Sequence, residues 1–388
     1  MPGDAEGSGT DVAGSNKTRR MAAVGAACAL VAAWAAGCAG TDVRGDGQRV
    51  TAAPAALPKA GPPSGVAEAA GDRCAAPPSV PPAQTALENG GAFLDLPTYD
   101  GSGQSTHFNV QFSPEGYLGH RYWMVLTPYP YRDATKENPS VLVSENGLDW
   151  SAPAGVANPV SGVPPDVDKK GHYSDGFLMR GAKGFELWFR YNPGREDGSR
   201  TDNSTSVIYR LRSADGVDWT DRETVFDGDG QDYMSPSLLA EGPGYRLWYT
   251  NDGGEFFRIE SEDLRTWSEP QAAEVSFADG YVPWHQEIVA TDQGYEALLL
   301  GYQLTADSGL PRFALFYAQS EDGLHFGEGR RIDPAKVDPR LAGYEFYKSS
   351  LVKDCGVYRL YLSAVTPDRV YQAFYKEVAV ADLPGLFG

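Results

Sequence analysis

The stretch SENGLDW, at Ser144–Trp150, is followed along the chain by three similar stretches. They read SADGVDW at Ser213–Trp219, SEDLRTW at Ser261–Trp267 and SEDGLHF at Ser320–Phe326. Each of these turn motifs comes after a strand-like run, and the Asn-Gly or Asp-Gly pair in three of them favours the positive φ of a tight turn. Because the motif returns at intervals of roughly 50–70 residues, it predicts structural units that stack or close into a ring. The aromatic residue that ends each motif is expected to pack on the sheet.

A second repeated feature gives the number of units. Five apolar, aromatic-rich runs are typical of central strands: residues 120–129, 185–192, 245–252, 295–303 and 357–364. Upstream of each run lies a further short segment: HFNVQF, YSDGFLM, MSPSLL, WHQEIVA and YKSSLV. Five units of three or four antiparallel strands predict an all-β, five-bladed β-propeller. A β-sandwich would explain the alternating pattern but not the repeated turn motif.

The N-terminal region divides the chain into three parts. Residues 1–37 are typical of an export signal of the lipoprotein type, with a basic start at Lys17, Arg19 and Arg20 and an apolar run before Cys38. Cys38 is then the expected lipidation site, although an ordinary signal peptide cut nearby is the alternative. Residues 38–90 are rich in Ala and Pro and predict a flexible tether. Residues 91–388 form the predicted propeller. The expected location is extracytoplasmic, with membrane contact only through the lipid anchor.

Charge and cysteine content narrow the possibilities further. The net charge of −19 argues against a nucleic-acid partner, since such partners favour basic surfaces. In an oxidising compartment the two remaining cysteines, Cys74 and Cys355, usually pair. Such a disulfide would join the two ends of the propeller, whereas two free thiols are the alternative.

The five upstream segments are the candidate lining of the central channel, because the innermost strand of each propeller blade faces the axis. They contain more polar side chains than buried strands normally do, and such clustering indicates a site. Candidate substrate-binding residues in these segments are His107, Asn109, Tyr173, Trp284, His285, Tyr347 and Lys348. The other reading is that these groups cap and bridge neighbouring blades.

The chain resembles the five-bladed propeller glycosidases of glycoside hydrolase families 43, 32 and 130 over roughly residues 92–383. The resemblance is based on the turn motifs, the aromatic central strands and the segments YSDGF and WHQEI. It implies acidic residues on inner strands of different blades, which places a general acid at Glu287 and a base or pKa modulator at Asp175. Asn109 stands where these glycosidases usually have Asp.

These features predict an extracellular glycoside hydrolase-like protein that acts on a glycan, with an inverting acid/base mechanism. Asn109 at the base position leaves a second hypothesis, a non-catalytic glycan-binding lipoprotein. Asp232 as an alternative acid, phosphorolysis, and a protein-interaction propeller are further alternatives. No cofactor is expected to be required and no metal ligands are assigned. A calcium ion near His285 is an option that comes only from the resemblance.

Overall fold

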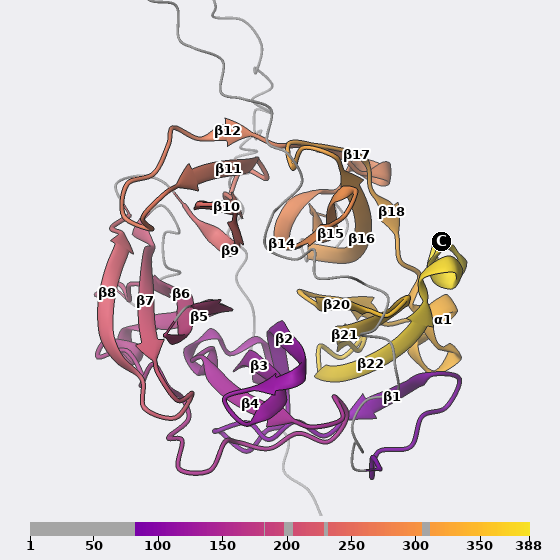
Figure 1. Ribbon diagram of the computed structural model, residues 1–388, viewed down its shortest axis with the longest axis horizontal. Helices are drawn as coiled ribbons and strands as arrows, with labels where there is room; N and C mark the ends of the chain where they lie inside the picture. The colour runs from indigo at the N-terminus through magenta and orange to yellow at the C-terminus, as the bar shows by residue number, and fades with distance from the viewer. Residues whose placement is uncertain (1–81, 182, 198–204, 229–231, 305–310) are drawn as a thin grey trace, which may run out of the picture. The chain divides into compact units, whose positions relative to one another are not determined.

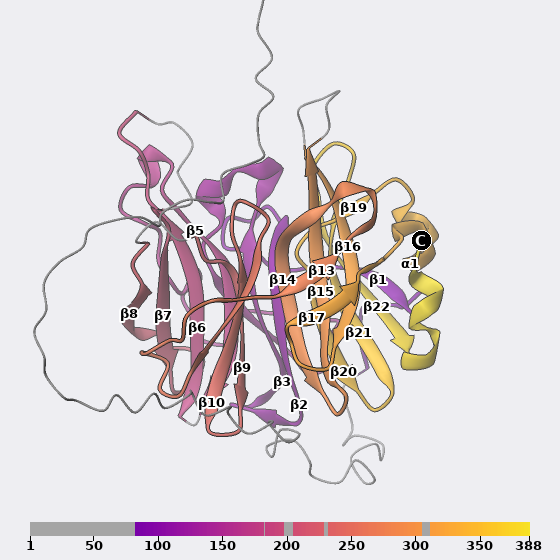
Figure 2. The ribbon, with the colours of Figure 1, turned by 90° about the horizontal axis from the view of Figure 1, so that it is seen from above.

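The computed structural model describes residues 82–181, 183–197, 205–228, 232–304 and 311–388. In this part of the chain the strands form five antiparallel sheets arranged around a central axis (Figure 1). Figure 2 shows that the strands run along this axis. The predicted five-bladed β-propeller is confirmed. The signal peptide, Cys38 and most of the tether lie outside the described residues.

Each blade is a short meander whose first strand lies next to the axis. The first blade has three strands, β2 (Ser105–Tyr117), β3 (His120–Pro128) and β4 (Ser140–Ser144). The second contains β5 (His172–Gly181), β6 (Gly184–Asn192), β7 (Val207–Ser213) and β8 (Thr220–Phe226). The third contains β9 (Met234–Glu241), β10 (Gly244–Thr250), β11 (Phe256–Ser261) and β12 (Gln271–Ala272). The fourth contains β14 (Val282–Thr291), β15 (Gly294–Leu304), β16 (Pro311–Ser320) and β18 (Arg330–Arg331).

The fifth blade is built from both ends of the domain. It contains β20 (Ser350–Asp354), β21 (Val357–Val365) and β22 (Tyr371–Ala379), and its outer strand is β1 (Gly91–Leu94). β1 pairs antiparallel with β22 and serves as the fourth strand of the last blade. The chain therefore does not turn from β22 into a further strand, as it does in the other four-stranded blades. This pairing explains why five blades contain only four turn motifs.

A few elements lie outside the five meanders. The short strand β19 (Glu345–Phe346) also pairs with β21, and β13 (Glu274–Ser276) pairs with β17 (His325–Glu328) in parallel. The α-helix α1 (Pro334–Val337) has a single turn. Among the described residues, no helix has the length and apolar character needed to span a membrane.

The chain just before β1 already contacts the first blade. The backbone N–H groups of Gln84 and Thr85 donate to the carboxylate of Asp149, at 2.7 and 3.0 Å. At the other end of the domain, Cys355 lies in the turn between β20 and β21 and is disulfide-bonded. Its predicted partner, Cys74, lies outside the described residues, so this pairing stays a prediction.

The four turn motifs share one hydrogen-bonding pattern. In the first, the hydroxyl of Ser144 accepts the N–H of Gly147 at 2.9 Å, and the side chain of Asn146 accepts two further backbone N–H groups. The indole of Trp150 donates back to the carbonyl of Gly147 at 3.1 Å. Side-chain acceptors thus satisfy the turn's backbone, and φ is positive at the fourth position, 76° at Gly147.

Each turn motif also packs against the central strand of the preceding blade. A Cβ on Gly216 of the second blade would lie 2.2 Å from the ring of Trp123 in the first. Likewise, Gly323 of the fourth blade contacts Trp248 of the third, whose indole donates to the Gly323 carbonyl at 2.7 Å. In the third motif Leu264 replaces the glycine, and its side chain joins the apolar cluster around Trp188.

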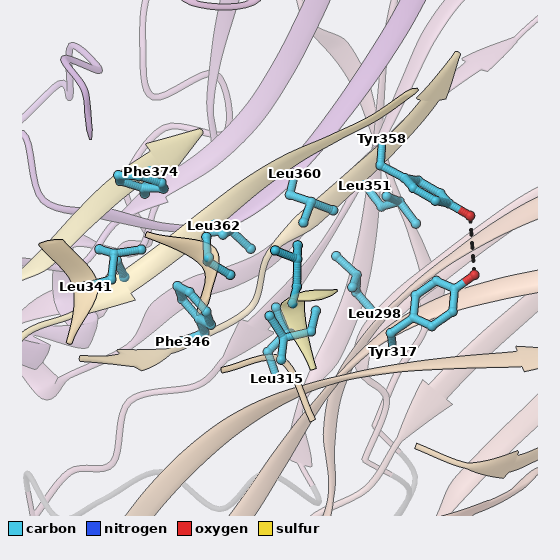
Figure 3. Packing of buried hydrophobic residues seen from close by; sticks show 14 of the residues in the cluster. Leu298, Leu315, Tyr317, Leu341, Phe346, Leu351, Tyr358, Leu360, Leu362 and Phe374 are labelled. Atoms are coloured by element: carbon cyan, nitrogen blue, oxygen red, sulfur yellow. Dashed lines mark hydrogen bonds between the residues drawn. The ribbon is translucent and has the colours of Figure 1, made fainter. Parts of the chain in front are cut away.

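Apolar side chains fill the remaining space between blades. Figure 3 shows the cluster between the fourth and fifth blades, where Leu298 and Leu315 meet Leu351 and Leu360. In the same cluster the hydroxyls of Tyr317 and Tyr358 lie 3.3 Å apart.

We predict that Gly216→Ala destabilises the domain by about 2–4 kcal/mol, because the new methyl group overlaps the Trp123 ring and φ at this position is 79°. Gly119→Ala is the matched control, since φ is 87° there but no atom lies within 4 Å of the added Cβ. The control is expected to lose about 1 kcal/mol. Urea denaturation measures both, and equal losses would contradict the proposed contact.

Candidate functional site at the propeller axis

Three innermost strands carry the same irregularity next to the axis. In β2, β5 and β9 two residues oppose a single residue of the central strand, and the first of the two is His107, Asp175 or Ser235. These residues have φ values of 55°, 54° and 49°, a conformation that normally favours glycine. Backbone strain of about 1–3 kcal/mol at each position is typical of functional sites. Bulges of this kind redirect a side chain out of the regular pleat.

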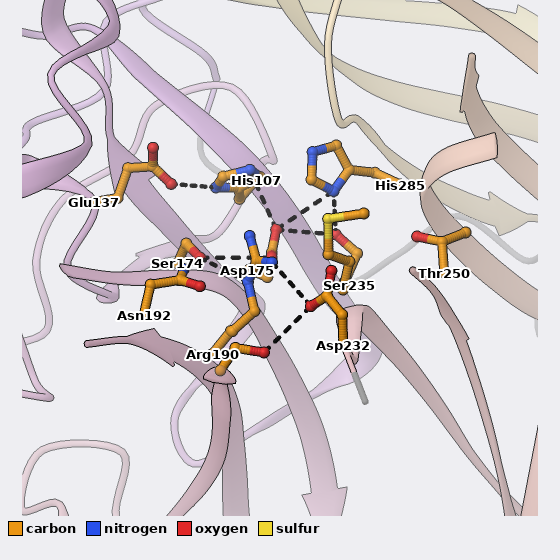
Figure 4. Close-up of polar contacts among 12 residues, drawn as sticks. His107, Glu137, Ser174, Asp175, Arg190, Asn192, Asp232, Ser235, Thr250 and His285 are labelled. Carbon is orange, nitrogen blue, oxygen red and sulfur yellow. Dashed lines mark hydrogen bonds and ion pairs between the residues drawn. The ribbon is translucent and has the colours of Figure 1, made fainter. Parts of the chain in front are cut away.

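The redirected side chains meet a histidine from the fourth blade around one carboxylate oxygen (Figure 4). Asp175 Oδ1 lies 3.3 Å from His107 Nε2 and 3.4 Å from His285 Nδ1, and it accepts the hydroxyl of Ser235 at 3.0 Å. All four residues are buried, with Asp175 completely inaccessible. Four blades therefore supply one residue each to a central cluster.

Surrounding groups fix the orientation of the cluster. The hydroxyl of Thr127 lies 2.8 Å from His107 Nδ1, which leaves Nε2 facing Asp175. The hydroxyl of Tyr347 lies 3.0 Å from His285 Nε2, which leaves Nδ1 on the same side. Supporting contacts of this type set the tautomer and direction of histidines that bind metal ions. The second oxygen of Asp175 pairs with Arg190 Nε at 2.9 Å.

The electrostatics favour a charged carboxylate beside two neutral rings. Burial lowers the pKa of His107 to about 3 and holds the pKa of His285 well below its usual range. Burial opposes ionisation of Asp175, but Arg190 and the two imidazoles together keep the pKa of its carboxyl well below normal. At neutral pH the two uncharged imidazole nitrogens and the carboxylate oxygen are all available as ligand atoms.

Two more buried carboxyl groups lie around the cluster. Glu137, on the loop after the 3-10 helix η2 (Ala134–Lys136), places Oε2 3.5 Å from His107 Nδ1, and burial raises its pKa well above normal. Asp232 Oδ1 accepts a hydrogen bond from Arg190 Nη1 at 3.3 Å, and burial raises the pKa of the Asp232 carboxyl to about 6. Asp232 Oδ2 is buried without a hydrogen-bond partner among the described residues.

Glu287 and Asn109 lie two residues further along their strands than His285 and His107, and there they bond to residues of other blades. Asn109 accepts the N–H of Leu178 in the second blade at 2.9 Å and donates to Glu287 Oε2 at 3.2 Å. Glu287 also accepts the hydroxyl of Ser350 at 2.6 Å and the N–H of Leu351. These bonds connect the innermost strands of different blades, so the side chains of Asn109 and Glu287 link blades to one another. Burial raises the pKa of Glu287 to about 7.

The other predicted binding residues are placed in different surroundings. Tyr173 packs inside the second blade against Phe189, and its hydroxyl accepts Arg222 NH1 at 3.0 Å, so it lies outside the central cluster. Trp284 stacks on Tyr302 with ring centroids 4.8 Å apart and touches His285 edge-on. Lys348 is buried beside the cluster, as its electrostatic coupling to Asp175 indicates.

The central cluster matches the donor set of a divalent cation. Ligand atoms of His107, Asp175 and His285 all lie within 4.8 Å of one another. His107 Nε2 is buried and has no hydrogen-bond partner among the described residues. Two neutral imidazoles and one carboxylate are a common ligand set for zinc and related metals. A cation would coordinate this nitrogen, which makes no hydrogen bond to the described residues, so the residues present fit a metal ion.

Sequence reasoning assigned no metal ligands, and two contributors to this site were missed. Nothing in the sequence distinguishes Glu137, which belongs to an irregular loop. Arg190 is not among the predicted site residues, although a charged residue in an otherwise apolar central strand is a signal of a buried partner.

Comparison with known proteins agrees with this architecture. No family model matches the chain. A curated protein of Flavonifractor plautii, the A type blood N-acetyl-alpha-D-galactosamine deacetylase, is 25% identical over 327 residues, which are 70% of this chain and 41% of that protein. The chain therefore spans about two-fifths of the length of this relative.

Solved structures show the same fold. The crystal structure of an N-acetylgalactosamine deacetylase from F. plautii in complex with blood group B trisaccharide superposes with a TM-score of 0.61 at 21% identity, covering 74% of this chain and 94% of that one. A glycoside hydrolase family 43 endo-arabinanase from Bacillus licheniformis superposes with a TM-score of 0.51 at 13% identity, covering 74% and 96%. The predicted likeness to the propeller glycosidases is confirmed at the level of fold.

We predict that Glu287→Gln becomes more stable relative to the wild type as pH rises. The pKa of Glu287 in the folded chain, about 7, exceeds the ordinary value of 4.5, so the wild type loses stability as pH rises through 7, while Gln cannot ionise. The difference in free energy of unfolding should shift by up to about 3 kcal/mol between pH 5 and 8.5.

Urea denaturation at the two pH values measures this shift. The control is Glu321→Gln, which replaces an exposed carboxylate and should show a constant difference from the wild type. A constant difference for Glu287→Gln as well would mean that its carboxyl stays ionised in the folded protein.

Proposed function

We propose that this protein is a metal-dependent hydrolase that removes an acyl group, such as acetyl, from an amino sugar in a glycan. The observation that supports this most strongly is the convergence of His107, Asp175 and His285 within 4.8 Å of one another, with His107 and Asp175 held at positive φ. The similarity to a protein named as an N-acetyl-galactosamine deacetylase favours the same reaction class. When bound, a divalent cation would act as a Lewis acid for the acyl carbonyl and activate water.

The chain's own residues have distinct roles in this proposal. Arg190 holds the second oxygen of Asp175 and keeps the carboxylate ionised, so Asp175 serves as a ligand. Thr127 and Tyr347 keep the two imidazole rings in place. Burial raises the pKa of the Glu137 carboxyl well above normal and so favours its protonated form, which would donate its proton to the leaving amine. The partly exposed Trp284 offers a ring face beside His285 for a sugar.

Glycoside hydrolysis is the second candidate, with Glu287 as general acid and Asp175 as base. The pKa of Glu287, raised to about 7 by burial, favours it, because a general acid must hold its proton near neutral pH. Two observations favour the first proposal instead: both oxygens of Asp175 are engaged, and Glu287 bonds groups of two other blades, the first and the fifth. A non-catalytic glycan-binding propeller is the third possibility.

The soluble product that is released, acetate or reducing sugar, distinguishes the deacylase from the glycosidase and from a non-catalytic protein. We expect the full chain, supplied with Zn²⁺, Mn²⁺ or Co²⁺, to release acetate from N-acetylhexosamine glycans without releasing reducing sugar. Reducing sugar that disappears in Glu287→Gln would favour the glycosidase. Glycan binding without release of acetate or reducing sugar would favour the non-catalytic, glycan-binding function.

Cation binding tests the site independently of turnover. We predict that His107→Ala and His285→Ala each weaken binding of Zn²⁺ or Co²⁺ by at least about 100-fold in calorimetry, because each removes one of three ligands. His120→Ala is the matched control, since His120 pairs with Glu145 on the surface, 2.7 Å away. Unchanged affinity in both site variants would rule out this metal site.

We also propose that the domain works outside the cytoplasm, held by a lipid on Cys38. The disulfide at Cys355 supports an oxidising compartment. Cys38→Ser is expected to move the protein from the membrane fraction to the soluble exported fraction. Immunoblotting of the two fractions measures this change, and a membrane-bound variant would contradict lipidation at Cys38.

A further inference from the structure

Lys348 occupies the fifth blade's place beside the central cluster. It lies two residues before the first residue of β20, Ser350, in a position that corresponds along the repeat to His107, Asp175, Ser235 and His285. Those four residues contact one another, but Lys348 Nζ has no hydrogen-bond partner among the described residues. The residue is only 1% exposed. Burial lowers the pKa of this lysine, because its amino group has lost its hydration without gaining a hydrogen-bond acceptor among the described residues.

Such a group is costly unless a further acceptor reaches it. Burial of an unpaired charge is unfavourable, and the three N–H bonds of a protonated lysine can donate to as many as three acceptors. Asp175 and Glu287 influence Lys348 electrostatically, yet neither carboxylate lies within hydrogen-bond distance. The other contacts of these two carboxylates, to Arg190 and to Ser350, hold them where they are.

The position of Lys348 relative to the channel limits what could reach it. A cavity of about 340 Å³ extends between the five inner strands and is lined by Asn109, Glu287 and residues beyond them on each strand. Lys348 does not line that cavity. The charged groups that act on it electrostatically are Asp175, Glu287 and Arg190, and Asp175 belongs to the central cluster, where the proposed reaction would take place.

We propose that the ammonium group of Lys348 binds the carboxylate product of deacylation, acetate in the simplest case. The inference rests on the proposed function, because acyl removal from an amine yields a small carboxylate beside the cluster. A carboxylate offers the charge-assisted acceptor that Lys348 lacks. It also balances charge, because a divalent cation at His107, Asp175 and His285 would add positive charge next to the lysine.

The test measures acetate itself. The full chain, with and without bound Zn²⁺, is titrated with ¹³C-labelled acetate, and binding is followed by line broadening in the NMR spectrum. Lys348→Met is expected to weaken acetate binding at least tenfold. Lys353→Met is the matched control, because it removes an exposed lysine of β20 that pairs with Glu296 at 2.7 Å, and its acetate affinity should match the wild type.

Neutral acetamide is the ligand control, since it has the shape of acetate without the charge. It is expected to bind weakly and equally to the wild type and to Lys348→Met. Equal acetate affinity in the wild type and in a folded Lys348→Met would overturn the proposal.

If near-UV circular dichroism shows that Lys348→Met is not folded, Lys348→Gln is used in its place. A crystal structure of the wild type with acetate then shows whether the ligand contacts Lys348. A carboxylate oxygen within hydrogen-bond distance of Nζ supports the proposal, and acetate bound elsewhere overturns it. If the protein deacylates an N-acyl sugar but the Lys348 substitution leaves its acetate affinity unchanged, only this inference is refuted. Acetate binding at Lys348 without deacylation of any N-acyl sugar refutes the proposed function and leaves an anion site.

Discussion

The contact between a turn and the central strand of the preceding blade is the interaction on which the ring depends. Trp123, Trp188, Trp248 and Tyr361 occupy the same place in four central strands, and the next turn motif packs on each of them. The fourth blade has Leu298 at this place, opposite the fifth blade's β20 and β21. A blade in this arrangement buries its aromatic residue only when its neighbour is present. The recurrence of the turn motif is thus a consequence of packing between units, as in other repeat proteins.

This packing gives the axis the rigidity that its chemistry requires. Three bulged strands hold non-glycine residues at positive φ, and such strain persists only where the surrounding structure enforces it. The bonds of Asn109, Ser237, Glu287 and Ser350 to backbone N–H groups of the following blade supply part of that constraint. A cluster of two histidines and an aspartate from three blades keeps its geometry because each strand is tied to the next.

The sequence contains enough information for the fold but only part of the site. The turn motifs and aromatic runs predict five blades, and the polar inner segments predict that His107, Asp175 and His285 face the axis. Their convergence on one point depends on the bulges, and nothing in the residues THF, SDG or MSP predicts a two-residue bulge. The bulges also decide that Asp175 faces the axis while Tyr173 packs inside its blade. Glu137 reaches the cluster through a loop whose path is a tertiary property, so no local pattern could have identified it.

The pairing of β1 with β22 has a consequence for biosynthesis. The strand that closes the fifth blade is translated before the four other blades, so it leaves the ribosome long before its partner exists. At about 5–20 residues per second, the interval before residues 371–379 emerge is on the order of 15–60 s. During that time the apolar segment Gly91–Leu94 is an unpaired strand that could associate with other nascent chains. A propeller closed in this way therefore depends on protection of its earliest strand until translation is complete.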